Sequence, residues 1–221
     1  KNLETYKSEC HHGTAYTNIK AEYSGINSEV LYYVPLDKTY EVWKVKVTNA
    51  SDVKRRLTVT GFCEFTNDNN YEQDQVNLQY TLFITRTFFE NNKIMQFINE
   101  NCVDSPVNGN SAVQRFLGLA GAPVDTYCGD KEEFLGRYHT YADPVGIING
   151  DCGNKLNYNG NGCGALSTKL ELEPGETKEF AFVLGMKNGK AADEILSRYE
   201  DSAKTCADEL KELKTYWHGK L

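Results

Sequence analysis

The sequence has no long hydrophobic run and no excess of positive charge. No stretch approaches the roughly 18 apolar residues of a membrane span, and no signal-peptide hydrophobic segment is present. Lys and Arg number 24 against 31 Asp and Glu, which gives a formal net charge of -7. Binding to nucleic acid or to an anionic membrane surface needs a basic face that neutralises phosphates. The composition therefore argues against both kinds of partner.

Paired cysteine motifs are also missing. The chain contains no C-x-x-C pair, and its seven cysteines stand at positions 10, 63, 102, 128, 152, 163 and 206. An odd number without such spacing favours reduced thiols, and hence a cytoplasmic protein. A disulfide between Cys152 and Cys163 in a secreted protein is the alternative. The first residue is Lys1 and not methionine, which is typical of an internal fragment or a processed chain.

Histidine is scarce, and its positions do not suit a metal ion. His11 and His12 follow Cys10, but adjacent side chains on a strand point to opposite faces and cannot readily share one ion. His139 and His218 have no zinc-type spacing. We therefore expect no metal site.

The residues that are present suffice for a folded core. Of 221 residues, 40% are hydrophobic and 25% are charged, a balance typical of globular proteins and not of disordered ones. This length suits one large all-β domain or two small domains.

Strand signals recur along most of the chain. Val42–Thr48 alternates between apolar and other residues with a period of two, as a half-buried strand does. Turn residues such as Ser24-Gly25 and Pro174-Gly175 separate such segments. We predict strands at 14–23, 27–34, 42–48, 56–65, 78–88, 93–99, 165–172 and 178–184. Repeated strands with turns between them predict a mainly β fold, a large antiparallel β-sandwich, with a barrel as the alternative.

The stretch 101–164 differs from its surroundings. It is dense in Gly, Asn, Asp and Pro, and we interpret it as long loops with short ordered pieces. Loops of that length usually carry function or are held by a partner surface.

A helical period follows Gly189. An apolar stripe with alternating spacings of three and four comprises Leu196, Tyr199, Ala203, Cys206, Leu210, Leu213 and Trp217. We predict a β-sandwich domain over 1–187, lacking its first strands, and an amphipathic linker helix over 188–221. Two interpretations remain open: the helix packs on its own sandwich, or it leads into and buries against a further domain.

The segment Thr66–Gln79 is the most polar in the chain. It combines amides, carboxylates and tyrosine without lysine or arginine, which suits sugar hydroxyls and the face of a sugar ring. The alternative is a solvated loop between two strands. The candidate substrate-binding residues are Asn67, Asn69, Asn70, Tyr71, Glu72, Gln73, Asp74, Gln75, Asn77 and Gln79.

Direct signals of catalysis are weak. Asp68, Glu72 and Asp74 could form a carboxylate pair for glycoside chemistry, but three acids in one loop are more often simply solvated. The glycine-rich stretch Gly118–Asp125 lacks the spacing of a phosphate-binding loop and indicates turns that let loops pack closely. We assign no catalytic residue to this chain.

Several strings, taken in order, resemble the amino-terminal domain of glycoside hydrolase family 94. They are ECHHGTAYT at 9–17, EVLYYVP at 29–35, EVWKVKVTN at 41–49, FCEF at 62–65 and L-x-x-L-x-x-x-W at 210–217. The match covers nearly the whole chain. The polar segment 66–75 and the stretch 118–125 look most similar to the cellodextrin phosphorylase branch.

The resemblance implies a fold and an activity. Members resemble one another in a large β-sandwich, a helical linker, an (α/α)6 catalytic barrel and a small jelly roll. They cleave a β-glucoside with inorganic phosphate, reversibly and with inversion, to give α-glucose 1-phosphate. A single Asp on the barrel is the general acid, and phosphate attacks the anomeric carbon directly, so no second carboxylate is needed. No cofactor is implied, only phosphate as co-substrate, and members are typically homodimers.

This chain departs from the family pattern at both ends. It begins where about the first hundred residues of a member should have passed, and it ends before the barrel. The resemblance therefore implies an accessory domain of a cellodextrin or cellobiose phosphorylase, inactive alone. Its partners would be a β-linked gluco-oligosaccharide, the catalytic barrel of the same protein and a second copy. Residues 67–79 would line the sugar cleft, and 125–141 is a weaker candidate for a dimer-facing cover. An autonomous carbohydrate-binding module and a purely structural assembly domain are the alternatives.

Overall fold

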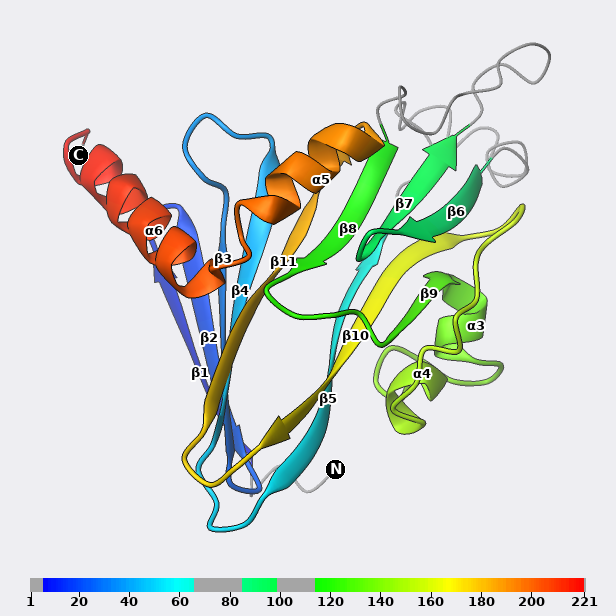
Figure 1. Ribbon diagram of the computed structural model, residues 1–221, viewed down its shortest axis with the longest axis horizontal. Coiled ribbons are helices and arrows are strands. Elements are labelled where there is room, and N and C mark those ends of the chain that lie inside the picture. Colours follow the sequence, from blue (N-terminus) through cyan, green and yellow to red (C-terminus); the bar gives the residue numbers. More distant parts are fainter. Residues whose placement is uncertain (1–5, 66–84, 99–113, 221) are drawn as a thin grey trace.

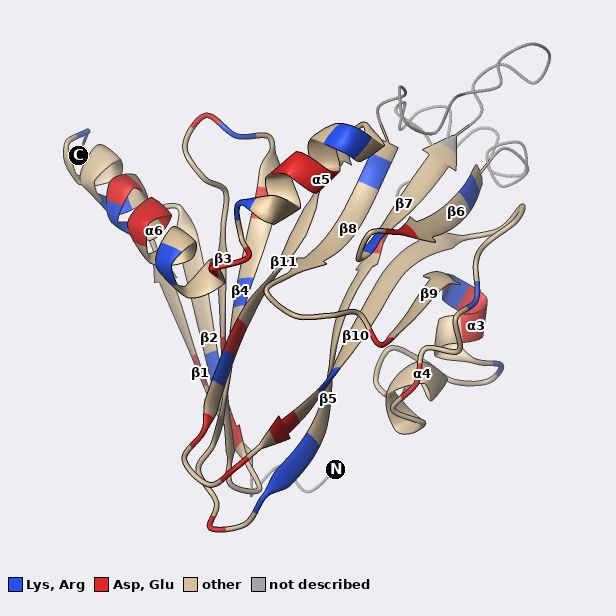
Figure 2. Cartoon of the chain, in the orientation of Figure 1, with Lys and Arg blue, Asp and Glu red and all other residues tan. Residues whose placement is uncertain are grey.

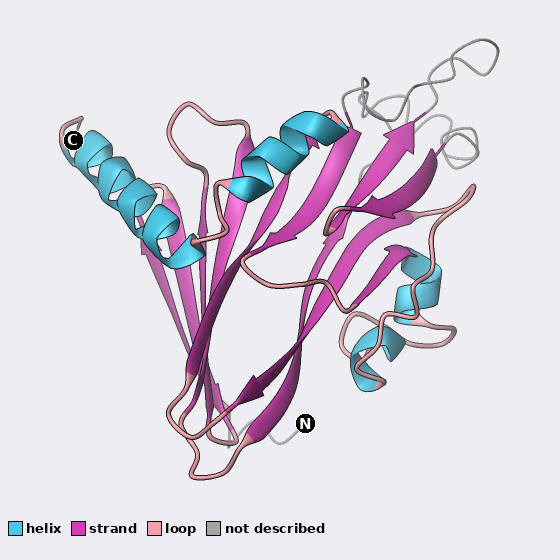
Figure 3. Ribbon diagram, in the orientation of Figure 1, coloured by secondary structure: helices cyan, strands magenta, loops and turns pink. Residues whose placement is uncertain are grey.

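The computed structural model describes residues 6–65, 85–98 and 114–220, and it consists mainly of strands (Figure 1, Figure 3). The strands are β1 (Lys7–Gly13), β2 (Tyr16–Tyr23), β3 (Ile26–Tyr33), β4 (Tyr40–Asn49), β5 (Arg55–Glu64), β6 (Thr85–Glu90), β7 (Lys93–Ile98), β8 (Gln114–Ala120), β9 (Thr126–Asp130), β10 (Gly162–Leu172) and β11 (Thr177–Lys187). The helices are α3 (Lys131–Leu135), α4 (Val145–Ile148), α5 (Gly189–Ser197) and α6 (Ser202–His218).

The described strands form two sheets. The larger has the order β1-β2-β3-β4-β11-β8-β7-β6, and the smaller has the order β5-β10-β9. Neighbouring strands pair antiparallel within both sheets. The sheets lie face to face, with β10 contacting β7, β8 and β11. The predicted antiparallel sandwich is confirmed, and the barrel alternative is not.

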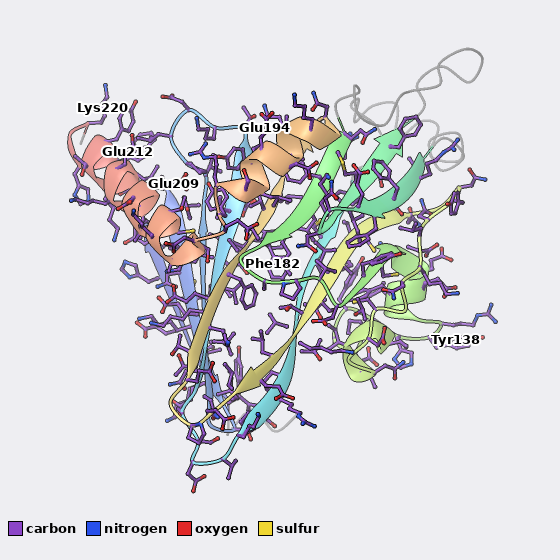
Figure 4. All side chains as sticks on the ribbon, in the orientation of Figure 1. Tyr138, Phe182, Glu194, Glu209, Glu212 and Lys220 are labelled. Carbon is purple, nitrogen blue, oxygen red and sulfur yellow. The ribbon has the colours of Figure 1, made fainter. Side chains whose placement is uncertain are left out.

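One hydrophobic core lies between the two sheets. On β11, Phe180 and Phe182 pack into it, whereas the intervening Ala181 and the following Val183 pack into a second core on the opposite face. Phe182, labelled in Figure 4, lies against Gly61 of β5, where an added Cβ would be 2.6 Å from the ring. This alternation is what the period-two pattern of the sequence predicts, because successive strand side chains point to opposite faces.

The second core lies beneath α5 and α6, which cover the outer face of the large sheet (Figure 1). α5 contacts β8 and β11, and α6 contacts β4 and β11. Gly118 of β8 allows α5 to come close, because a Cβ there would lie 2.6 Å from Leu196 Cδ1. The glycine-rich stretch thus does permit close packing, but Gly118 does so inside a strand. Gly121, with a φ of 79°, forms the expected turn.

The prediction of a single helix over 188–221 is wrong. Residues 198–201 separate α5 from α6, and each helix has its own amino-terminal cap. The side chain of Asn188 accepts a hydrogen bond from the backbone of Ala191, and that of Asp201 accepts one from Lys204. Caps of this kind satisfy backbone donors that a helix leaves free at its start. The break lets both helices follow the curved sheet, so the helices pack on their own sandwich.

Most of the predicted apolar stripe is nevertheless buried. Leu196, Tyr199, Cys206 and Leu213 are at most 5% exposed, and Leu210 packs against them. Ala203 is exposed because it follows the break and faces away from the sheet. Trp217, near the end of α6, is 36% exposed.

Three strands were not predicted. β8 and β9 fall in the stretch interpreted as loops, and β1 lies before the first predicted strand. β8 runs between β11 and β7, and all seven of its residues are buried. A strand with both faces buried shows no alternation of apolar and polar residues, so the sequence of β8 lacks the period-two signal that predicted the other strands. The other predicted strands are confirmed within a few residues, although 78–84 lies outside the described residues.

Candidate functional site

The residues predicted to bind sugar, Asn67 to Gln79, lie outside the described residues. Both neighbours of that segment are described: β5 ends at Glu64 and β6 begins at Thr85. β5 is at an edge of the small sheet, and β6 is at an edge of the large sheet. The role of residues 67–79 in sugar binding stays a prediction.

A groove of about 1110 Å³ lies between the β3–β4 loop and α6, and we call it the loop–helix groove. Residues 34–38 of the loop line one side, and Tyr216 and Trp217 of α6 line the other. Tyr16, next to the β1–β2 turn, and Tyr32 of β3 also contribute. Tyr33, at the end of β3, lines the groove as well, so four tyrosines and one tryptophan surround it.

A carboxylate at the base of this groove organises its polar groups. Glu209 of α6 accepts hydrogen bonds from Tyr33 at 2.7 Å and from Tyr199 at 2.8 and 3.0 Å. Arg198 lies 3.3 Å from the same carboxylate, and its other nitrogen donates to Tyr40 at 3.3 Å. Tyr33, Tyr40 and Tyr199 are at most 4% exposed. The network therefore connects the turn between the helices to β3 and β4.

The two tyrosines bonded to Glu209 have raised pKa values. Burial makes the largest contribution to the raised pKa of Tyr33, and the neighbouring Cys206 and Glu209 raise it further. Burial also raises the pKa of Tyr199, with further contributions from Tyr40 and Glu209. Both hydroxyls therefore stay protonated at neutral pH and can donate hydrogen bonds to Glu209.

The rim of the groove is aromatic and exposed. Tyr216 is 45% exposed and Trp217 36%, and their rings meet edge to face at 5.3 Å. Val34, across the groove, is 48% exposed. Glu209, Glu212 and Lys220 are labelled on this end of the molecule in Figure 4. An aromatic rim around a hydrogen-bonded base suits contact with another surface or with a polar ring-shaped ligand.

A second exposed cluster lies in the insert between β9 and β10, residues 131–161. Its exposed apolar residues are Tyr138, Tyr141, Ile147, Ile148 and Tyr158. The insert is anchored by Phe134, which stacks on Phe62 with ring centroids 4.9 Å apart. Part of the predicted dimer-facing cover, 125–141, is in this insert, and Tyr138 is 96% exposed. The insert is an ordered surface with α3 and α4.

Glu64 connects the insert to β5. It accepts hydrogen bonds from Tyr141 and from Lys131, the latter at 2.9 Å. Partial burial by itself raises the pKa of Glu64, but the bonds from Tyr141 and Lys131 outweigh it and lower that pKa. The carboxylate is therefore ionised at neutral pH and holds the insert in place.

The four histidines and the six described cysteines form no evident reactive centre. His12 contacts Thr17 at 3.0 Å and Cys10 at 3.4 Å, whereas His11 lies near the Tyr16 ring on the other face of β1. Within the residues that the structure describes, no group of three potential ligands could hold a metal ion. The six described cysteines are free, so Cys152 and Cys163 form no disulfide here.

Sequence reasoning missed Glu209. It stands three residues after Cys206 and four before Leu213, both on the buried stripe. Residues at these spacings share one face of a helix, so the position itself was a signal. What could not be read from the sequence is that Tyr33 and Tyr199 supply its donors.

Comparisons with known proteins identify the family. The model of the glycosyl hydrolase 94 supersandwich domain matches residues 2–202. The chain is 30% identical over 217 residues to an N,N'-diacetylchitobiose phosphorylase of Vibrio furnissii, covering 98% of this chain and 26% of the relative. It is 26% identical over 204 residues to a solabiose phosphorylase of Paenibacillus borealis, covering 90% and 24%.

A solved polysaccharide lyase structure has a TM-score of 0.44 at 13% identity, covering 78% of this chain and 21% of the lyase. The chain spans about a quarter of the length of the two phosphorylases, 26% and 24%. No helix in the described part of the chain is long and apolar enough to cross a membrane. Because the family model matches most of its residues, this chain belongs to the glycosyl hydrolase 94 supersandwich domain family.

Proposed function

We propose that this chain is the accessory domain of a reversible, inverting β-glucan phosphorylase. The family match over residues 2–202 is the observation that carries the proposal, together with the phosphorylases among its relatives. The domain does not perform the chemistry. It contributes contacts to the oligosaccharide cleft and to a second copy of the protein, in the cytoplasm.

The loop–helix groove supports a role in holding another domain. Its base is fixed by buried hydrogen bonds, and its rim leaves Tyr216, Trp217 and Val34 exposed. Aromatic residues are enriched in the centres of protein interfaces. We assign this groove to contact with the catalytic barrel of the same protein, and the insert with Tyr138 to contact with the second copy.

The proposed substrates are cellobiose or a cellodextrin together with inorganic phosphate, and the proposed product is α-glucose 1-phosphate. This choice rests on the similarity of the segments 66–75 and 118–125 to the cellodextrin branch. The similarity to chitobiose and solabiose phosphorylases supports phosphorolysis as the reaction class and leaves the sugar open.

The test compares this 221-residue chain with the complete protein that contains it. Each is incubated with cellobiose or cellotetraose and phosphate, and glucose 1-phosphate is measured. We expect release by the complete protein and none by the chain. Release by the chain alone would overturn the accessory role. If the complete protein instead phosphorolyses N,N'-diacetylchitobiose only, the reaction class stands and the proposed substrate is wrong.

A further inference from the structure

Five neighbouring strands carry a row of charges that alternate in sign. The paired positions are Glu9 on β1, Lys20 on β2, Glu29 on β3, Lys46 on β4 and Glu179 on β11. Directly paired residues of antiparallel strands point to the same face, and neighbouring strands lie about 4.8 Å apart. The row therefore crosses the helix-bearing face of the large sheet; Figure 2 shows acidic and basic residues on these strands.

A groove of about 500 Å³ lies between this row and α6, and we call it the ladder groove. All five charged residues of the row line it. Leu31 of β3 and Leu210 of α6 add apolar surface, and Ala207 lies on the helix side. The groove is on the opposite flank of α6 from Glu212 and Tyr216, which line the loop–helix groove.

An unsatisfied acceptor lies beside the ladder groove. The Asn18 amide nitrogen donates to Glu29 at 2.6 Å, which fixes the orientation of the amide because a carboxylate accepts hydrogen bonds only. The amide oxygen is buried and has no hydrogen-bond partner among the described residues. A buried acceptor without a donor costs about 1–3 kcal/mol.

The charge pattern selects the chemistry of the ligand. Four lysines line the groove, Lys214 of α6 included, against three glutamates. Glu179 is paired with Lys44 at 2.8 Å and with Lys46 at 3.9 Å. An anion placed near Lys20 also lies near Glu9 and Glu29, and a cation near Glu29 lies near Lys20 and Lys46. Strongly charged ligands of either sign are therefore disfavoured.

We propose that the ladder groove binds a neutral carbohydrate. Sugar hydroxyls both donate and accept, so they can bond alternately to ammonium and carboxylate groups along the row. Leu210, which is partly exposed, suits the apolar face of a sugar ring. A volume of about 500 Å³ is in the range of small-molecule sites and accommodates a disaccharide. The choice of β-linked sugars as probes rests on the proposed function. The expectation that the groove binds a neutral carbohydrate rests on its own residues.

The experiment titrates the 221-residue chain with cellobiose, N,N'-diacetylchitobiose and inorganic phosphate, with affinities measured by calorimetry and contacts mapped by amide chemical shifts. We expect saturable binding of a disaccharide that changes less than about threefold between low and high salt, because neutral hydrogen bonds are little screened. The shifts should map to β1–β4 and α6. Saturable binding of phosphate without binding of either sugar would overturn the proposal.

Two variants with a matched control locate the site. Ala207→Trp fills the ladder groove and should abolish binding, whereas Asp208→Trp, next to it on α6 but outside the groove, should leave the affinity unchanged. Lys20→Met removes one donor of the row and should weaken binding about tenfold, a loss typical of a hydrogen bond to a charged group. Equal affinities for all three variants would refute the assignment. Loss of binding in Ala207→Trp while the complete protein still releases glucose 1-phosphate separates this site from the proposed function.

Discussion

The hydroxyl of Tyr33 on β3 donates a 2.7 Å hydrogen bond to Glu209 on α6, between residues 176 positions apart in the sequence. Tyr199 donates to the same carboxylate from the turn between the two helices. One partly exposed acid thus holds two buried hydroxyls and fixes α6 on the sheet. It also forms the base of the loop–helix groove, so groove shape and domain stability depend on the same contact.

Replacing Glu209 should destabilise the domain. Glu209→Ala leaves the buried hydroxyls of Tyr33 and Tyr199 without their acceptor, and we expect a loss of about 2–4 kcal/mol in the free energy of unfolding. Urea denaturation measures it. Glu212→Ala, on the exposed side of the same helix, is the control and should change stability by less than about 0.5 kcal/mol. Similar values for the two variants would show that the network contributes nothing.

The pair Lys93–Asp193 should be a second point of sensitivity. The Lys93 side chain is fully buried, and its ammonium lies 2.6 Å from Asp193 of α5. Among the described residues, Asp193→Ala leaves the buried Lys93 ammonium with Glu90, at 3.4 Å, as its one remaining acidic partner. We expect a loss of about 3 kcal/mol in the free energy of unfolding, at the lower end for a buried ion pair because Asp193 is partly exposed. Glu194→Ala, one residue further along α5, should be nearly neutral. Lys93→Met should cost less than Asp193→Ala; the reverse order would contradict the argument.

Thiol modification should separate the cysteines by burial. Burial raises the pKa of Cys63 to about 12 and that of Cys206 to about 11. At pH 8 only about one Cys63 thiol in ten thousand is then ionised, whereas Cys10 is exposed. We expect iodoacetamide to modify Cys10 first, as peptide mass spectrometry would show.

The same shift makes stability depend on alkaline pH. The folded-state pKa of Cys63 lies above its unfolded value of about 8.5, so the neutral thiol contributes stability below pH 8.5. This contribution is lost as the pH rises toward 12. Cys63→Ala should flatten the decline of unfolding free energy over this range. A wild-type decline unchanged by the substitution would point to other groups.

The polar segment can be tested in the complete protein. Asn70→Ala and Gln75→Ala should raise KM for the oligosaccharide about fivefold, since one net hydrogen bond contributes about 1 kcal/mol. The KM for phosphate should stay unchanged. Asn27→Ala, on the exposed side of β3, serves as the control. Unchanged kinetics with both substrates would favour a purely structural role for the domain.

Local patterns predicted most of the strands and the buried face of the helices. Val42–Thr48 is part of β4, and Phe180 and Ala181 face different cores, because alternation along a strand sorts residues without reference to the rest of the chain. The helix break was readable in principle from Asn188 and Asp201, which both act as caps. The apolar stripe hid it, because the spacing continues across the break.

The sequence by itself determined the class of fold, the faces of its strands and, through ordered motifs, the family. Those features depend on residue spacing along the chain. Only the tertiary structure decided that β8 inserts between β11 and β7, that Glu209 serves Tyr33 and Tyr199, and that five charges from Glu9 to Glu179 align in one row. Each of these three features depends on how segments far apart in the sequence are aligned with one another. That alignment is set by which faces of the sheet are buried, and not by the spacing of residues along the chain.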